Sequence, residues 1–136
     1  MTLREGGSYL RLPLPVANLA RSKAFYEKAL APLGYVFVDE VPEPGTGIPI
    51  IGFGNDGDAD FWIGGSPRSI FRRPLREELV AMSRAAVDAF HAAALAAGGK
   101  DTGAPAFHPM GNVKIYKASV TDPDGHTIDV VWFKPV

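Results

Sequence analysis

Two arginines, Arg11 and Arg76, occupy equivalent positions in an internal repeat of the sequence. Residues 24–34 and 89–99 share Ala-Phe, Ala-Leu-Ala and Gly in the same order, with every matching pair 65 positions apart. A guanidinium group stays protonated in proteins and donates forked hydrogen bonds to oxygen anions, but it has no lone pair for a cation. If both side chains point into one cavity, the two equivalent arginines could bind the oxygens of an anionic or carbonyl-rich small molecule.

The bulk composition is that of a soluble globular chain. Of the 136 residues, 46% are hydrophobic and 21% are charged, and the net charge is -1. This balance gives no general reason to bind nucleic acid or an anionic membrane, and no apolar run is long enough to span a bilayer. The absence of cysteine excludes disulfides and thiolate metal sites and is consistent with a cytoplasmic protein.

The pattern of apolar residues predicts a β-α-β-β-β order that occurs twice. In the first copy, the apolar pattern predicts strands at 8–16, 35–39, 48–54 and 60–63. It also predicts a helix at 19–33, which Asn18 caps and Gly34 ends. In the second copy, the helix is capped by Ser83, and the middle strands are weakly marked; its elements are a strand at 76–82, a helix at 84–97, and strands at 113–121 and 127–133.

The two copies are expected to form one domain, 1–136, arranged around a pseudo-twofold axis. Module one spans about residues 8–65, and module two spans about residues 75–134. Residues 66–74, which include three arginines, read as a solvated linker between the modules.

Three segments together resemble the vicinal oxygen chelate superfamily. They are Asn-Leu-Ala-Arg-Ser-Lys-Ala-Phe-Tyr at 18–26, Asp-Phe-Trp-Ile-Gly at 60–64 and Asp-Pro-Asp-Gly-His at 122–126. This superfamily holds glyoxalase I, extradiol dioxygenases, fosfomycin-resistance enzymes and bleomycin-resistance proteins. The resemblance implies an α+β fold in which two βαβββ modules form a cupped mixed sheet, with the helices on the convex face and a ligand cavity on the concave face. It also implies a homodimer, and two prolines in the first strand would leave sheet edges for a partner.

The resemblance also implies where a metal would be held. Metal-dependent members usually place a histidine on the first strand of each module and a glutamate on the last strand, and the matching residues are Arg11, Arg76 and Asp129. On this basis the metal site has been lost, and no metal or other cofactor is expected. Two roles for the arginines remain open: they line an oxygen-binding site, or they pair with Asp129, Glu77 or Glu78 and hold the modules together.

Three residues are candidates for moving protons in the cup. His108 is placed on a loop over the cavity mouth and could act as a general acid or base. Tyr116 precedes the 122–125 turn and could donate a proton or hydrogen bond into the cup. Asp129 could offset one arginine charge or accept a proton.

Asp60 and Trp62 share one face of their predicted strand and are candidates for ligand binding, although core packing is the simpler role for Trp62. His91, on a helix, and His126, after a turn, are expected at the surface. The scattered histidines show no metal-ligand spacing.

Three functions follow in order of preference. The first is a metal-independent lyase or isomerase that acts on an oxygenated or anionic organic molecule, with the arginines stabilising a developing enolate or carboxylate. The second is a non-catalytic protein that binds a small molecule or confers resistance to it. The third, a metal-dependent glyoxalase or dioxygenase, requires the alignment at Arg11 and Arg76 to be wrong.

Overall fold

The protein contains two four-stranded sheets, each with one helix. The computed structural model describes residues 13–65 and 74–134. The first module consists of β1 (Leu14–Val16), α1 (Leu19–Leu30), the 3₁₀ helix η1 (Ala31–Leu33), β2 (Val36–Pro42), β3 (Pro49–Asn55) and β4 (Asp58–Gly65). The second consists of β5 (Arg76–Val80), α2 (Arg84–Ala96), β6 (Lys100–Met110), β7 (Val113–Thr121) and β8 (Thr127–Phe133). The predicted α+β fold with two βαβββ units is confirmed.

The two sheets have the same topology. Their strand orders are β1-β4-β3-β2 and β5-β8-β7-β6. In each sheet the first strand runs parallel to the last strand of its module, and the other neighbours are antiparallel. This arrangement follows from the helix after the first strand, which returns the chain so that a parallel neighbour can form.

The helices begin where their caps predict. The side chain of Asn18 accepts a hydrogen bond from the backbone N of Arg21 at 2.9 Å, and Ser83 Oγ accepts one from the backbone N of Ala86 at 3.1 Å. The first helix was expected to continue to residue 33, but α1 ends at Leu30 and η1 completes the turn. Gly34 then reverses the chain with φ of 83°, which a residue with a side chain rarely adopts.

The core lies between the helices and the sheets. In module one it is built on three fully buried rings, Tyr26 from α1 against Phe53 and Phe61 from β3 and β4, with centroids 5.0–6.4 Å apart. The two modules share this core, because a Cβ atom on Gly99 would lie 3.0 Å from the ring of Phe25 in α1. The glycine that closes the second repeat therefore permits close packing between the modules.

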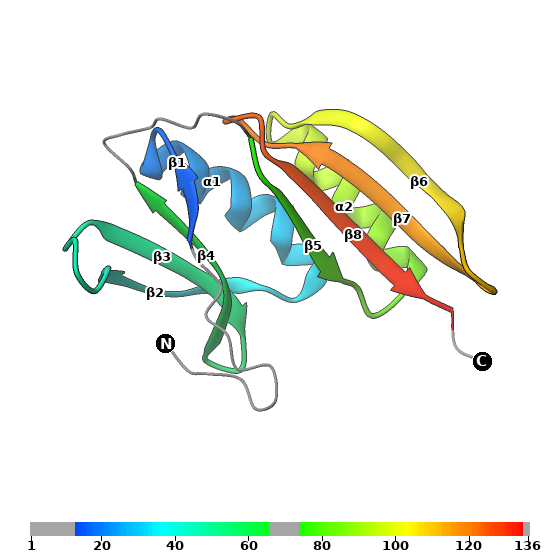
Figure 1. Cartoon of the computed structure of the whole chain (residues 1–136), viewed down its shortest axis with the longest axis horizontal. Coiled ribbons are helices and arrows are strands. Elements are labelled where there is room, and N and C mark those ends of the chain that lie inside the picture. Colours follow the sequence, from blue (N-terminus) through cyan, green and yellow to red (C-terminus); the bar gives the residue numbers. More distant parts are fainter. Residues whose placement is uncertain (1–12, 66–73, 135–136) are drawn as a thin grey trace.

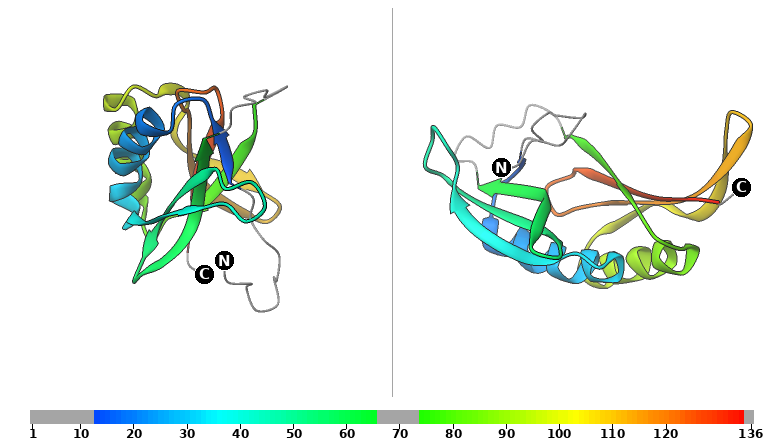
Figure 2. Two further views of the ribbon diagram at one scale, coloured as in Figure 1. Left: turned by 90° about the vertical axis from the view of Figure 1, so that its left-hand side faces the viewer. Right: turned by 90° about the horizontal axis from the view of Figure 1, so that it is seen from below.

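Both helices cover the same side of the molecule. Figure 1 shows the two sheets beside each other, and the right-hand view of Figure 2 shows α1 and α2 along the convex side, with the sheets rising at either end. The sheet faces turned away from the helices form the concave side, which we call the open face. On the sheet of module one (β1–β4, sheet A) its residues include Gly52 and Trp62, and on the sheet of module two (β5–β8, sheet B) they include Arg76, Glu78, Lys117, Ser119 and Asp129.

The structure corrects the sequence-based prediction for residues 100–110. This segment is the edge strand β6 and not a loop, so His108 lies in a strand. An edge strand pairs on one side only, and most residues of β6 are exposed, so its sequence lacks the apolar alternation of a half-buried strand. The first strand of module two is also shorter than expected, because β5 ends at Val80.

Within residues 13–65 and 74–134, neither helix has the length and apolar character needed to cross a lipid bilayer.

Candidate active site or ligand site on the open face

Arg76 and Asp129 form a two-pronged ion pair on the open face of sheet B. Arg76 Nε donates to Asp129 Oδ2 at 2.6 Å, and Nη2 donates to Oδ1 at 3.1 Å. Ser119 Oγ donates a further hydrogen bond to Asp129 Oδ1. The carboxylate is 5% exposed, whereas the arginine side chain is 63% exposed. Asp129 therefore holds the guanidinium from below while much of the guanidinium faces solvent.

The strand register places these three residues together. On the antiparallel pair β7–β8, Ser119 is opposite Asp129, so their side chains lie on the same face. Arg76 comes from β5, on the other side of β8, and is paired in register with Thr127 two residues before Asp129. The arginine then reaches along the strand to the carboxylate.

The environment of Asp129 keeps it ionised. Burial alone would raise the pKa of this carboxyl group, but hydrogen bonds from Arg76 and Ser119 and the positive charges of Arg76 and Lys117 outweigh burial and lower the pKa. The same contact raises the pKa of Arg76, chiefly through its hydrogen bond to Asp129. A carboxylate with a lowered pKa and both oxygens bonded is a poor proton acceptor, so Asp129 is better suited to positioning Arg76 than to base catalysis.

The residues at the expected ligand positions do not fit a divalent metal. Arg11 lies outside the described residues, and at the other two positions Arg76 occupies both oxygens of Asp129. A cation bound to this carboxylate would have to displace the guanidinium or lie against its positive charge. Elsewhere in the described part of the chain, no three His, Asp or Glu side chains are grouped to hold a metal ion.

The open face of sheet A carries Trp62. Phe61 points to α1, because its ring lies 5.0 Å from that of Tyr26, so Trp62, the next residue on β4, points to the open face. Asp60 lies at a register shift of β4, where alternation does not fix the face of its side chain. Both side chains are half-buried. Trp62 is thus not a residue of the core between the sheet and the helices.

The structure separates His108 from Tyr116. His108 is opposite Ile115 on the edge strand β6, and both lie on the open face, where His108 is exposed. Tyr116 lies on the other face, because its hydroxyl donates to Asp88 of α2 at 2.6 Å. The guanidinium of Arg84 stacks on its ring at 4.7 Å from the centroid. The predicted placement of Tyr116 in the cup is wrong, since the register of β7 turns it toward the helix.

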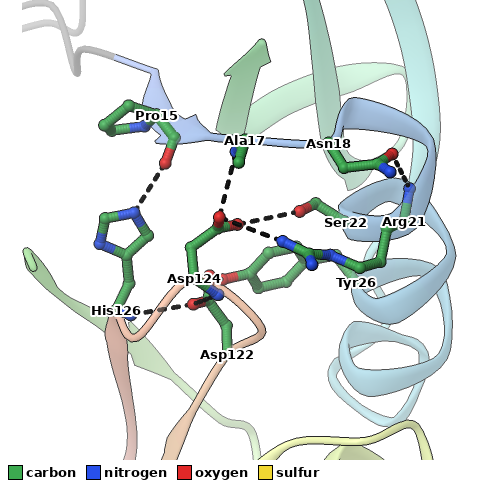
Figure 3. A network of polar contacts seen from close by, with 9 residues as sticks. All are labelled: Pro15, Ala17, Asn18, Arg21, Ser22, Tyr26, Asp122, Asp124 and His126. Carbon is green, nitrogen blue, oxygen red and sulfur yellow. Dashed lines mark hydrogen bonds and ion pairs between the residues drawn. The ribbon is translucent and has the colours of Figure 1, made fainter. Parts of the chain in front are cut away.

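A second polar cluster joins the two modules (Figure 3). The carboxylate of Asp124, in the turn between β7 and β8, accepts hydrogen bonds at the start of α1: from the backbone N of Ala17 at 3.1 Å, from Arg21 Nη2 at 3.1 Å and from Ser22 Oγ at 3.3 Å. A negative charge at a helix N-terminus is favourable because of the helix dipole and the unpaired N–H groups there. The turn of module two therefore binds the start of the helix of module one.

The same turn contains a buried histidine. His126, expected at the surface, is fully buried: its Nδ1 accepts from the backbone N of Leu75 at 2.9 Å, and Nε2 lies 2.6 Å from Pro15 O. Since Nδ1 is the acceptor, Nε2 carries the proton that is donated to Pro15. Asp122 Oδ2 accepts from the buried hydroxyl of Tyr26 at 2.5 Å, and burial, followed by the nearby charge of Asp122, raises the Tyr26 pKa well above its usual value. His91, also expected at the surface, is half-buried, and its Nε2 lies 3.1 Å from Asp101 Oδ1.

Ser119 was not predicted as a site residue, and the turn at 122–126 was not predicted to join the two modules. Ser119 could have been found, because the predicted strands 113–121 and 127–133 end and begin at Thr121 and Thr127, and pairing these two residues places Ser119 opposite Asp129. The contacts of Asp124 and His126 join segments more than 100 residues apart and carry no local signal.

Comparisons with known proteins agree with this fold. The family model of the Glyoxalase/Bleomycin resistance protein/Dioxygenase superfamily matches residues 8–130. A glyoxalase/bleomycin resistance protein from Albidiferax ferrireducens is 26% identical, with a TM-score of 0.71, and the match covers 89% of this chain and 95% of that chain. No curated protein matches the sequence.

Two further structures share the fold at lower identity. A glyoxalase-related enzyme from Fulvimarina pelagi is 20% identical, with a TM-score of 0.61, over 89% of this chain and 84% of that one. TnmS3, an antibiotic binding protein from Streptomyces, is 22% identical, with a TM-score of 0.61, over 90% and 93%. Because the family model spans most of the sequence and the fold agrees, the chain belongs to the glyoxalase/bleomycin resistance protein/dioxygenase superfamily.

Proposed function

We propose that this protein binds a small anionic or carbonyl-rich organic molecule on its open face, without a divalent metal. The observation that carries the proposal is the exposed guanidinium of Arg76, held in place by the buried carboxylate of Asp129. Such preorganisation lowers the entropy lost when a ligand binds. The pair with Asp129 engages Nε and Nη2, so the remaining N–H groups of the guanidinium can donate to a ligand oxygen.

Two other observations support binding as the main role. Lys117 adds a second positive charge on the same face, close enough to lower the pKa of Asp129. An antibiotic binding protein also has this fold, which shows that the fold serves binding as well as catalysis. Among the residues first considered for proton transfer, Tyr116 faces the helix and Asp129 is bonded at both oxygens.

A metal-independent lyase or isomerase is the second candidate, because a glyoxalase-related enzyme has this fold. His108 is exposed on the open face of sheet B, but it lies on the edge strand β6 in the row of Phe133, whereas Arg76 lies on the opposite edge strand β5 in the row of Thr127. An imidazole at that position does not reach a ligand oxygen held by Arg76, so His108→Asn should leave ligand binding unchanged.

Thermal-shift titration with a panel of carboxylates and 2-oxo acids tests the binding function. A ligand that binds only the folded state raises the melting temperature, and the stabilisation grows with the logarithm of one plus the ratio of the free ligand concentration to Kd. Arg76→Gln should weaken binding by about tenfold or more, because a charge-assisted hydrogen bond contributes about 1.5–3 kcal/mol. Arg84→Gln is the matched control, since Arg84 stacks on Phe107 and Tyr116 on the helix side.

The same titration with Mg²⁺, Mn²⁺, Fe²⁺, Co²⁺, Ni²⁺ and Zn²⁺, with and without EDTA, tests the independence from metals. We expect no shift with any of these ions. A saturable shift that EDTA reverses, or carboxylate binding that is equal in Arg76→Gln and the unaltered protein, would contradict the proposal.

A further inference from the structure

The two modules carry different residues at the corresponding positions of the open face. Leu14 of β1 and Leu79 of β5 are equivalent in the repeat, and their register partners are Ile63 and Val130. The residue before each partner is Trp62 in module one and Asp129 in module two. The indole of Trp62 in sheet A therefore occupies the position that corresponds to the carboxylate of Asp129 in sheet B.

The partner strand differs in the same way. Ser119 is opposite Asp129 and bonds to it, whereas Gly52 is opposite Trp62. A Cβ atom on Gly52 would lie 2.9 Å from Cη2 and Cζ3 of the indole and 2.7 Å from Cβ of Ala59. Only glycine leaves room for this placement, so the indole lies across the backbone of β3.

This placement differs from ordinary core packing. On β4 the core residues are Phe61 and Ile63, which are 1% and 0% exposed and point to the helix. Trp132, the other tryptophan of the chain, packs against the buried core cluster, and Trp62 does not belong to that cluster. The outer edge of the Trp62 indole therefore lies over β3, and the side chain is partly exposed on the open face.

We infer that the ligand contains a planar conjugated group, which stacks on Trp62, in addition to the oxygen anion bound near Arg76. Aromatic rings gain from offset stacking beyond the area that they bury, and an apolar platform with a few polar groups is typical of small-molecule sites. The oxygen-anion part rests on the proposed function, whereas the platform rests on Trp62 and Gly52 alone. The ligand class is thus an aromatic or polyunsaturated carboxylate or enolate.

Naphthalene-2-carboxylate and cyclohexanecarboxylate test the inference, because they share the carboxylate and differ in planarity. In Trp132→Phe, Trp62 is the sole tryptophan, so quenching of its fluorescence reports directly on ligand stacking. Naphthalene-2-carboxylate should quench this emission and bind about tenfold more tightly than cyclohexanecarboxylate, as expected for a stacked aromatic pair.

Two substitutions then remove the platform in different ways. Trp62→Leu keeps an apolar side chain, and Gly52→Ala displaces the indole; thermal unfolding and circular dichroism confirm that each variant is folded. Both should lose about tenfold in affinity for naphthalene-2-carboxylate and keep the affinity for cyclohexanecarboxylate. Trp132→Phe is the matched control and should keep both affinities.

Equal affinity for naphthalene-2-carboxylate in Trp62→Leu and the unaltered protein overturns the inference. The proposed function still stands in that case if Arg76→Gln weakens the binding of either carboxylate. If binding depends on Trp62 but not on Arg76, the platform is supported and the oxygen-anion site is overturned. If neither carboxylate binds at millimolar concentration, both are overturned.

Discussion

At the scale of single residues, the chemistry of the open face depends on which charge is buried. Asp129 is buried and Arg76 is exposed. The carboxylate therefore holds the guanidinium in position, and the guanidinium is the group that a ligand can contact. Of the two roles left open for the arginines, pairing with a carboxylate is observed for Arg76. Its partner is Asp129, so this pairing does not involve Glu77 or Glu78. The pair joins β5 to β8 within module two and does not hold the modules together.

Asp129→Asn should destabilise the protein by about 1–2 kcal/mol at pH 7, because a charged acceptor is replaced by a neutral one beneath Arg76. The pKa of Asp129 is lowered by folding. Its contribution is therefore present above the unfolded pKa of about 4 and is lost as the pH falls through the lower folded pKa. Urea unfolding should show a difference in the free energy of unfolding between the unaltered protein and Asp129→Asn at pH 7, and this difference should shrink toward pH 2.

Glu78→Gln is the control for this change. Glu78 is exposed and lies beside Asp129 in the strand register, and exposed charges contribute little to stability. The role given to Asp129 would be refuted if the loss of stability in Asp129→Asn were equal at pH 7 and pH 2, or if Glu78→Gln lost as much.

At the scale of elements, the turn between β7 and β8 fixes module two on module one. Asp124 is 4% exposed at its side chain and binds Ala17 and Ser22 at the start of α1, while His126 joins β1 to the segment before β5. These contacts fix β1, the strand that follows Arg11. The turn thus positions the open face of both sheets without contributing a side chain to it.

Asp124→Ala should lower the free energy of unfolding by about 1–3 kcal/mol, because it leaves the backbone N–H of Ala17, the guanidinium of Arg21 and the hydroxyl of Ser22 without their acceptor. Amide hydrogen exchange at Ala17 should become faster, which is a local readout at the module junction. Asp58→Ala, at the exposed start of β4 in module one, is the matched control. Unchanged exchange at Ala17 would show that the turn does not hold α1.

At the scale of the whole molecule, the curved pair of sheets leaves apolar residues exposed around module two. Val80 is 58% exposed and Met82 is 88% exposed, and β5 and β6 are the edge strands of their sheet. Large exposed apolar side chains and strand edges favour association with another chain.

We expect a homodimer, as the sequence analysis predicts. Sedimentation velocity at micromolar concentration should give a single species of twice the chain mass of 14.5 kDa. Val80→Lys together with Met82→Lys should shift this species toward the monomer if module two forms the interface. A species of 14.5 kDa at all concentrations for the unaltered protein would contradict the expectation.

The sequence by itself determined the elements that have a local signal. Caps at Asn18 and Ser83 gave the starts of both helices, alternation gave most strands, and the repeat with its three motifs gave the family. Those features are encoded within a few residues, so they survive without knowledge of the fold. The strand β6 lacked such a signal because it lies exposed at an edge.

Only the tertiary structure decided which face each strand residue occupies and which distant groups meet. A shift of one residue in register turns every side chain to the opposite face, and this is why Tyr116 was misplaced. The burial of His126 and the pairing of Asp124 with α1 depend on how the two modules pack. The placement of Trp62 on Gly52 likewise depends on the pairing of β3 with β4, which the sequence pattern does not specify.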